Sequence, residues 1–332
     1  MTARAVILGC AGRELGAQER AFFREADPWG FILFARNVGT PGELRRLTGD
    51  LRAAVGRDAP VLIDQEGGRV QRMRAPHWRE FMPALDQMRA ARDPLRAQWL
   101  RYRIIAAELR DAGIDVNCAP LADLVERETH PVVLNRLYGE DVETVVAAAR
   151  ACAAGLTAGG VLPVVKHLPG YGRARVDSHL DLPRNAAPLA ELRARDFAPF
   201  AALSDSVMGM TAHIVIEAID PDRPATTSPA VMDMIRSEIG FGGLIMTDDL
   251  NMQALAGSLA QRARAALAAG CDVILQCNGQ RADMEQVLTE VPALSGQSAA
   301  RAEAALAART PAGPADPDAL AAELAGLIGQ AA

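Results

Sequence analysis

The sequence predicts a single (β/α)8 barrel, an α/β fold with extra helices at its C-terminus, and three observations lead to this prediction. Short, continuous apolar runs of strand length recur along the 332 residues, amphipathic segments separate them, and polar residues close most of the runs. Continuous apolar runs are typical of parallel strands that are covered on both faces. Eight units of strand and helix are the number that closes a barrel.

The expected strands follow one another at intervals that leave room for a helix between them. They span residues 6–8, 31–34, 61–64, 114–117, 163–167, 207–213, 244–248 and 273–276. Thr40 begins a capping box with proline at the first helical position, and Asp93 and Ser228 are each followed by proline in the same way. Gly113 and Gly270 mark the ends of two helices.

The end of the chain, from about residue 298 to residue 332, is rich in alanine and is broken by proline and glycine at 310–317. We expect one or two helices here that pack on the barrel, so that residues 1–332 form one catalytic domain. An open, doubly wound sheet is the competing fold. It would normally carry a glycine-rich phosphate loop after an early strand, and neither G-x-G-x-x-G nor G-K-[ST] occurs in the sequence.

The charge of the chain argues against two classes of partner. The net charge is −6, and arginines alternate with acidic residues on the expected helix faces, so neither a nucleic acid nor a membrane surface is an expected partner. No apolar stretch approaches the ~20 residues of a spanning helix. Residues 1–10 lack the basic region and cleavage site of a secretory signal. We expect a cytoplasmic monomer that acts on a small molecule.

The cysteines and histidines lack the spacings of metal sites. Five cysteines are scattered without a C-x-x-C pair, which is typical of reduced, buried thiols in a cytoplasmic protein. Five histidines form neither H-x-H nor H-E-x-x-H. We therefore expect no metal and no other cofactor.

Polar residues close several of the expected strands, at the end of a barrel where catalytic residues gather. They are Asp64, Asn117, Lys166, His167, His213, Asp248, Asp249 and Asn278. Charged groups at the ends of several buried strands are costly unless they face a shared polar pocket. The pattern therefore predicts a pocket for a polar ligand.

The fifth strand is followed by a loop, residues 166–179, that glycines and a proline keep from regular structure. Asp177 and His179 are two residues apart, so in an extended loop their side chains can converge. A carboxylate beside an imidazole fixes its tautomer and favours its protonated form, which suits a general acid–base. An ordinary salt bridge in a loop would explain the same pair.

Three segments, residues 62–72, 166–179 and 240–252, closely resemble glycoside hydrolase family 3 when they are taken together and in this order. Within that family they resemble the bacterial β-N-acetylglucosaminidases (β-hexosaminidases) of peptidoglycan recycling. Residues 31–37 and 135–139 extend the resemblance to nearly the whole chain. It implies a retaining exo-enzyme that removes β-linked N-acetylglucosamine (GlcNAc) from peptidoglycan fragments, such as GlcNAc-anhydroMurNAc with or without its peptide.

The resemblance also implies the roles of individual residues. Asp248, the first aspartate of T-D-D-L, is the nucleophile, and Asp177 and His179 of D-S-H are the acid–base dyad. The residues that contact the sugar are Asp64, Arg72, Arg136, Lys166 and His167. Relatives usually have histidine where this chain has Tyr171, and Asp-Thr where it has Arg173-Ala174. This departure affects the packing of the loop and the finer substrate contacts.

Other hypotheses compete with this one. A metal-dependent hydrolase, a Schiff-base lyase that uses Lys166 and a non-catalytic muropeptide sensor are possible on the same fold. A further alternative uses the acetamide of the substrate as nucleophile, assisted by Asp248 and Asp249. Because neighbours on a strand point to opposite faces, we expect only one of these two in the lumen unless the strand has already ended, with Asp249 as a cap or support.

Two further polar residues keep open roles. His213 either packs beside the pocket or contacts the substrate, because it closes the sixth strand. Asp123 either orients Arg136 or Lys166, or caps a turn.

Overall fold

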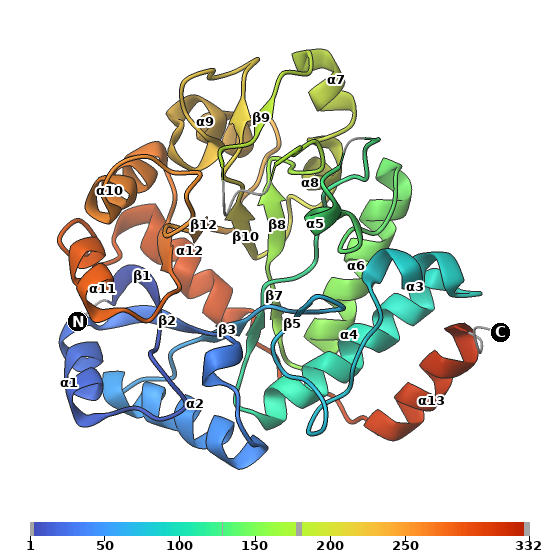
Figure 1. Cartoon of the computed structure of the whole chain (residues 1–332), viewed down its shortest axis with the longest axis horizontal. Coiled ribbons are helices and arrows are strands. Elements are labelled where there is room, and N and C mark those ends of the chain that lie inside the picture. The colour runs from blue at the N-terminus through green and yellow to red at the C-terminus, as the bar shows by residue number, and fades with distance from the viewer. Residues whose placement is uncertain (1–2, 128, 177–180, 329–332) are drawn as a thin grey trace.

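The computed structural model describes residues 3–127, 129–176 and 181–328. Its parallel sheet has the strand order β7-β6-β3-β2-β1-β13-β12-β10-β8. The strands are β1 (Arg4–Gly9), β2 (Pro28–Leu33), β3 (Val61–Ile63), β6 (Val116–Asn117), β7 (Leu162–Pro163), β8 (Val165–Leu168), β10 (Met208–Thr211), β12 (Leu244–Asp249) and β13 (Val273–Gln276). The sheet begins on β7 and ends on β8, which are two halves of one chain segment. It therefore closes into a barrel, and the predicted fold is confirmed (Figure 1).

Helices surround the sheet in Figure 1. They are α1 (Ala17–Ala26), α2 (Pro41–Val55), α3 (Ala84–Ala90), α4 (Pro94–Asp111), α5 (Pro131–Leu134), α6 (Val142–Ala158), α7 (Leu189–Ala194), α8 (Ala198–Ala202), α9 (Pro229–Ser237), α10 (Leu259–Ala269), α11 (Arg281–Leu288), α12 (Gly296–Ala307) and α13 (Pro317–Ile328). The predicted caps are confirmed, because the side chains of Thr40, Asp93 and Ser228 each accept a backbone N–H of the first turn. Gly270 ends α10 in the left-handed region, at φ 114.

The core consists of apolar side chains between the strands and the surrounding helices. Ile7, Leu62 and Ile274 on three of the strands are fully buried. All five cysteines are buried and free, as predicted. Across the described ranges, no helix combines the length and the apolar character that a membrane span requires. The assignment of residues 1–332 to one catalytic domain stays a prediction.

Two small sheets lie outside the barrel. The strands β4 (Gln65–Gly67) and β5 (Val70–Gln71) form an antiparallel hairpin directly after β3. The strands β9 (Arg184–Asn185) and β11 (Val215–Ile216) pair in parallel, and each follows a barrel strand, β8 and β10 respectively. The hairpin brings further polar residues to the carboxyl end of the barrel.

The loop after β8 is held tightly against the loop after β6. A Cβ atom on Gly172 would lie 2.0 Å from the carbonyl oxygen of Leu124, so only glycine permits this approach. The hydroxyl of Thr129 donates to the carbonyl of Gly172 at 2.7 Å, and the N–H of His130 donates to the carbonyl of Ala174 at 3.1 Å. These contacts fix the two loops as one wall of the barrel mouth.

Candidate active site

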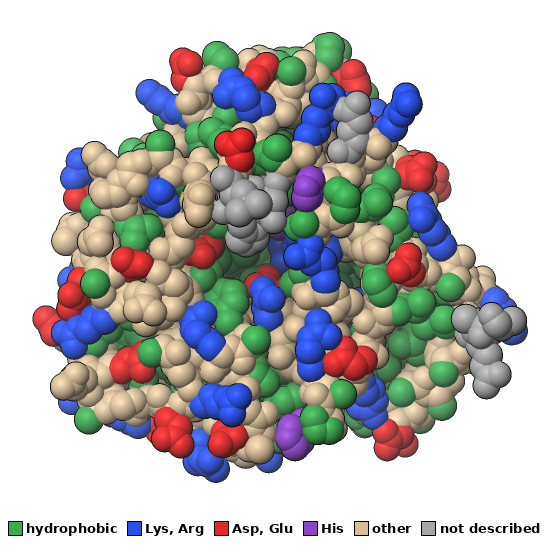
Figure 2. All heavy atoms as spheres, viewed as in Figure 1, with side chains coloured by type: hydrophobic (Ala, Val, Ile, Leu, Met, Phe, Trp, Pro, Cys, Tyr) green, Lys and Arg blue, Asp and Glu red, His purple; other side chains and the backbone are tan. Residues whose placement is uncertain are grey.

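The carboxyl ends of the strands surround a cavity of about 240 Å³. The face of the molecule in Figure 2 is hollowed near its centre, with Lys and Arg side chains around the hollow. The cavity wall includes every described residue that the sequence predicted as nucleophile or sugar contact: Asp64, Arg72, Arg136, Lys166, His167 and Asp248. The predicted dyad, Asp177 and His179, lies outside the described residues.

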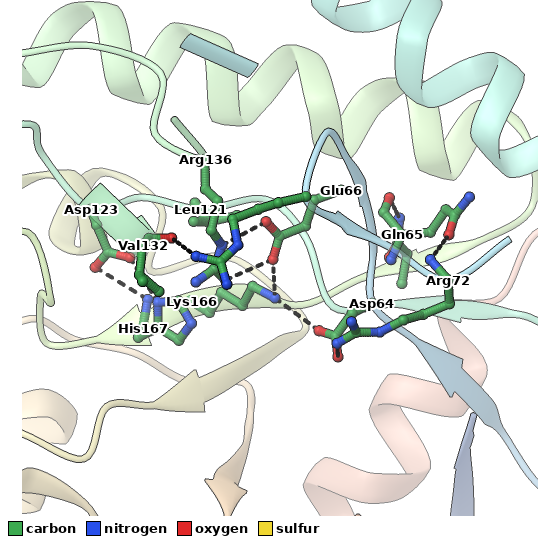
Figure 3. A network of polar contacts seen from close by, with 12 residues as sticks. Asp64, Gln65, Glu66, Arg72, Leu121, Asp123, Val132, Arg136, Lys166 and His167 are labelled. Atoms are coloured by element: carbon green, nitrogen blue, oxygen red, sulfur yellow. Dashed lines mark hydrogen bonds and ion pairs between the residues drawn. The ribbon is translucent and has the colours of Figure 1, made fainter. Parts of the chain in front are cut away.

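A buried ammonium group lies at the centre of the polar wall. Nζ of Lys166 is 3.0 Å from Oδ1 of Asp64 and 2.7 Å from Oε1 of Glu66. Asp64 directly follows β3, Glu66 lies on the hairpin strand β4, and Lys166 lies on β8 (Figure 3). Lys166 and Glu66 are each only 2% exposed, so their charges need these partners.

Two arginines extend this cluster on either side. Arg136 binds both carboxylate oxygens of Glu66, at 2.9 and 2.8 Å, and Arg72 lies 3.2 Å from Oδ2 of Asp64. The order Arg72, Asp64, Lys166, Glu66, Arg136 is a chain of alternating charges (Figure 3). Three cations and two anions leave it one positive charge.

The charges in the cluster determine its ionisation. Burial by itself would raise the pKa of Glu66, but Arg136 and Lys166 outweigh it and lower this pKa to about 2. Lys166 and Arg72 likewise hold the pKa of Asp64 below its usual range against burial. Burial would lower the pKa of Lys166, yet Glu66 and Asp64 raise it. Lys166 is therefore a charged ammonium at neutral pH, which argues against the Schiff-base hypothesis, because that chemistry needs a free amine.

Asp248 and its neighbour Asp249 end β12 and both line the cavity. The expectation that only one of them faces the lumen is wrong, because the pairing of β12 with β13 loses its register between Met246 and Asp249. Oδ1 of Asp248 accepts the N–H of Asp249 at 2.8 Å. Oδ1 of Asp249 accepts the N–H of Asn251 at 3.1 Å and that of Cys277 at 3.2 Å. Asp249 thus supports two backbone segments, as expected, and burial and the charge of Asp248 raise its pKa.

A second buried pair lies beside the cluster. Nδ1 of His167 is 2.8 Å from Oδ2 of Asp123 (Figure 3). Oδ1 of Asp123 accepts the N–H of Tyr171 at 2.7 Å. Of the two roles left open for Asp123, the described contacts do not include one to Arg136 or Lys166, and Asp123 instead holds His167 and the backbone at Tyr171. The ring of Tyr171 lies 5.6 Å from that of His167 and also lines the cavity.

Two other residues at the strand ends, His213 and Asn117, bind neighbouring groups of the protein and hold them in place. Nδ1 of His213 is 2.7 Å from the Thr226 hydroxyl, and its Nε2 is 3.0 Å from the carbonyl of Asp249. Both ring nitrogens are thus engaged, and burial lowers the pKa of His213. Asn117 donates to the carbonyl of Gln65 and accepts its N–H, both at 3.0 Å, so it holds the hairpin in place.

The sequence did not indicate several residues of the cavity wall. Phe34, Arg69 and Met252 line it, and the guanidinium of Arg72 lies 5.3 Å from the centre of the Phe34 ring. Phe34 could have been suspected, because it closes the second expected strand. Within the ranges that the structure describes, no group of three or more His, Cys, Asp or Glu side chains is arranged to hold a metal ion.

A closed parallel barrel with this polar cavity at the carboxyl ends of its strands is an α/β-barrel enzyme site. Residues 16–307 match the model of the glycosyl hydrolase family 3 N-terminal domain. The chain therefore belongs to glycoside hydrolase family 3, and the resemblance seen in the sequence is confirmed.

Curated and solved relatives agree with this assignment. A β-hexosaminidase of Alkalilimnicola ehrlichii is 39% identical over 295 residues, which are 86% of this chain and 84% of the relative. The crystal structure of NagZ from Neisseria gonorrhoeae with N-trifluoroacetyl-D-glucosamine is 30% identical, covers 99% of both chains and gives a TM-score of 0.86. The structure of a family 3 β-N-acetylglucosaminidase from Paenibacillus is 28% identical and gives a TM-score of 0.82. The present chain covers 62% of the length of that protein.

Proposed function

We propose that this glycoside hydrolase is a retaining exo-β-N-acetylglucosaminidase whose nucleophile is Asp248. The observation that carries the proposal is the position of Asp248 at the end of β12, in one cavity with the charged cluster of Asp64, Lys166 and Arg136. The names of the relatives and the glucosamine derivative bound to the Neisseria protein support N-acetylglucosamine as the sugar.

The proposed chemistry is a double displacement. The carboxylate of Asp248 forms a bond to the anomeric carbon while the glycosidic oxygen departs with a proton from His179. His179, now deprotonated, then takes a proton from water, and that water breaks the bond to Asp248. Asp177 supplies the negative charge that orients His179 and favours its protonated form.

The cluster would bind the sugar as a pre-formed set of donors and acceptors. Lys166 and Arg72 donate to hydroxyls, and Asp64 accepts from them. Their ion pairs already fix the side chains, so little freedom is lost when the sugar binds. Asp123 fixes His167 in the same way, because it binds Nδ1 at 2.8 Å and leaves Nε2 to contact the substrate.

The size of the cavity favours a single sugar. At about 240 Å³ it is smaller than the ~300–1,000 Å³ of drug-sized ligand sites. A cavity that holds one terminal residue supports exo-action, with the rest of the substrate outside it. We further propose that this rest is the muramyl part of a cytoplasmic peptidoglycan fragment, with or without its peptide.

Asp249 favours the covalent route over assistance by the substrate's acetamide. The assisted route needs a second carboxylate that is available to orient the acetamide. Oδ1 of Asp249 instead accepts the N–H groups of Asn251 and Cys277. These bonds hold the carboxylate towards the two backbone segments, and turning it towards an acetamide would leave their donors unsatisfied.

The test begins with a panel of nitrophenyl glycosides, in which the N-acetyl-β-glucosaminide should be the preferred substrate. Proton NMR in the first minutes should show the β-anomer, since two inversions restore the configuration. Asp248→Ala should lose at least ~10³-fold in turnover, and Asp249→Ala much less. A 5-fluoro glycoside should leave a mass adduct on the peptide that contains Asp248. An α-anomer as first product, or an oxazoline without any adduct, would contradict the mechanism.

A further inference from the structure

A second and larger cavity, of about 490 Å³, lies beside the one described above and is lined by four arginines. They are Arg127, Arg173, Arg175 and Arg184. Its walls are β9, α7 and the loops after β6 and β8, and Figure 1 shows β9 and α7 next to each other at the top of the view. Among the described residues, two carboxylates, Glu126 and Glu191, share this lining with the arginines.

Both carboxylates of the lining are already bound by arginines. Glu191 accepts Nη2 of Arg173 at 2.6 Å, and Glu126 accepts two nitrogens of Arg195, at 3.0 and 2.9 Å. Arg173 is further bound through Nε to both oxygens of Asp196, at 3.0 Å each. Arg173 is thus a fixed part of the wall, and it anchors the loop after β8.

Two other arginines of this lining keep donors for a ligand. Arg184 is exposed, and within the described part of the chain its Nε is bound by Glu217 at 2.6 Å and its Nη2 by the carbonyl of Pro221 at 2.8 Å, which leaves Nη1 without a described partner. Arg127 is exposed and has no hydrogen bond or ion pair to any residue that the structure describes. An arginine at the wall of a cavity, with its fork of donors unused, suits a planar carboxylate.

The two cavities share the same two loops. Tyr171 lines the small cavity and Arg173 the large one, and only the glycine at 172 separates them in the chain. The loop after β6 does the same, since Arg127 lines the large cavity and Val132 the small one. The large cavity therefore adjoins the same two loops as the sugar site.

The size of the sugar site determines which part of the substrate can come near this cavity. The small cavity has room for one sugar, so the leaving part of the substrate lies outside it. The large cavity adjoins the same two loops that wall the sugar site, so a leaving part that extends over these loops meets the arginines.

We propose that the arginine-lined cavity binds carboxylates on the leaving part of the substrate and makes the enzyme prefer an anionic aglycone. The inference rests on the proposed function and adds to it a site for the charged groups that a muramyl peptide carries. Arg127 and Arg184 bind the carboxylate, while Arg173 positions the loop.

The test compares kcat/KM for three substrates: GlcNAc-anhydroMurNAc-peptide, the same compound with its carboxylates converted to amides, and an uncharged nitrophenyl N-acetyl-β-glucosaminide. In the wild type the carboxylate form should be preferred over the amide by about fivefold, and added salt should weaken the preference. Arg127→Ala should remove most of this preference through KM, and Arg127→Lys should keep part of it. Arg150→Ala is the matched control, because Arg150 is an exposed arginine on α6 that pairs with Asp205 at 2.8 Å.

Each outcome decides between the inferences. If the wild type hydrolyses the carboxylate and amide forms equally well, or if Arg127→Ala matches the control on all three substrates, the arginine site is wrong while the proposed function stands. If the wild type hydrolyses no β-N-acetylglucosaminide at all, the proposed function fails and the arginine site fails with it. Unchanged thermal unfolding of Arg127→Ala shows that a lost preference does not come from misfolding.

Discussion

The ammonium group of Lys166 lies 2.7 Å from Oε1 of Glu66, and each of these side chains is 2% exposed. Lys166 is the only lysine in the sequence, in which Lys and Arg together number 35. The other 34 of these 35 residues are arginines. A compact ammonium can lie between two carboxylates, whereas a planar guanidinium needs more room. We infer that the shape of the site, rather than its charge alone, requires lysine here.

Replacement of this lysine should destabilise the fold. In Lys166→Met the buried Asp64 and Glu66 lose the cation between them, and we expect the free energy of unfolding to fall by about 2–4 kcal/mol. Urea unfolding at pH 7, followed by circular dichroism, measures the change. Arg150→Met at the exposed surface serves as control and should change stability by no more than ~0.5 kcal/mol. Equal stability of the two variants would show that the buried pair contributes nothing net.

The same cluster predicts a dependence of stability on pH. Because the folded state lowers the pKa of Glu66 to about 2 and lowers that of Asp64, both groups stabilise the fold above their unfolded pKa of about 4. This contribution is lost as pH falls towards the folded pKa. The urea midpoint of the wild type should therefore drop between pH 5 and about pH 2.5. Glu66→Gln should be less stable at pH 7 but should lose less over this interval, and parallel curves for the two proteins would refute the assignment.

The pair of Asp123 and His167 predicts a change in substrate binding. Asp123→Ala removes the acceptor at 2.8 Å from Nδ1 of His167, so the ring is no longer held towards the sugar. We expect kcat/KM for the nitrophenyl substrate to fall by about tenfold or more, mainly through KM. Asp123→Asn keeps an oxygen at this position and should lose less. If both variants equal the wild type, His167 does not depend on Asp123.

The barrel was predictable because parallel strands that are covered on both faces appear in the sequence as continuous apolar runs. Such runs can be recognised without knowing which strands lie next to them. The helix starts at Thr40 and Asp93 were predictable for a related reason, since a cap acts within four residues. The hairpin after β3 was not predicted, because its residues, 65–71, are mostly polar. Its shape depends on a contact with Asn117, far along the chain.

The site was predictable as a set of residues but not as a network. Strand-end polarity and the family resemblance named Asp64, Lys166 and Arg136. Neither observation showed that Glu66 binds both Lys166 and Arg136. The contact between Glu66 and Lys166 joins residues that are 100 positions apart, and it depends on the closure of the barrel. The role of Asp123 escaped for the same reason, as its partner His167 is 44 residues away.

The acid–base dyad gives the last prediction, although Asp177 and His179 lie outside the described residues. A general acid matters most when the leaving group is poor, because a stable anion needs little protonation to depart. His179→Ala should therefore damage hydrolysis of the natural disaccharide far more than that of a dinitrophenyl glycoside. Asp177→Asn should give a milder loss of the same kind, since His179 then lacks its orienting charge.

Rates across aryl glycosides of graded leaving-group acidity separate this role from a mere displacement of the loop. Displacement would lower every substrate by a similar factor, whereas loss of the proton donor steepens the dependence on leaving-group acidity. A flat dependence in His179→Ala would show that His179 is not the acid. His213 could not replace it, because Thr226 and the backbone occupy both of its ring nitrogens, and neither could Glu66, whose pKa of about 2 leaves it ionised. The acid would then be sought at His167, which lines the cavity and whose Nδ1 is bound by Asp123, while its Nε2 has no partner among the described residues.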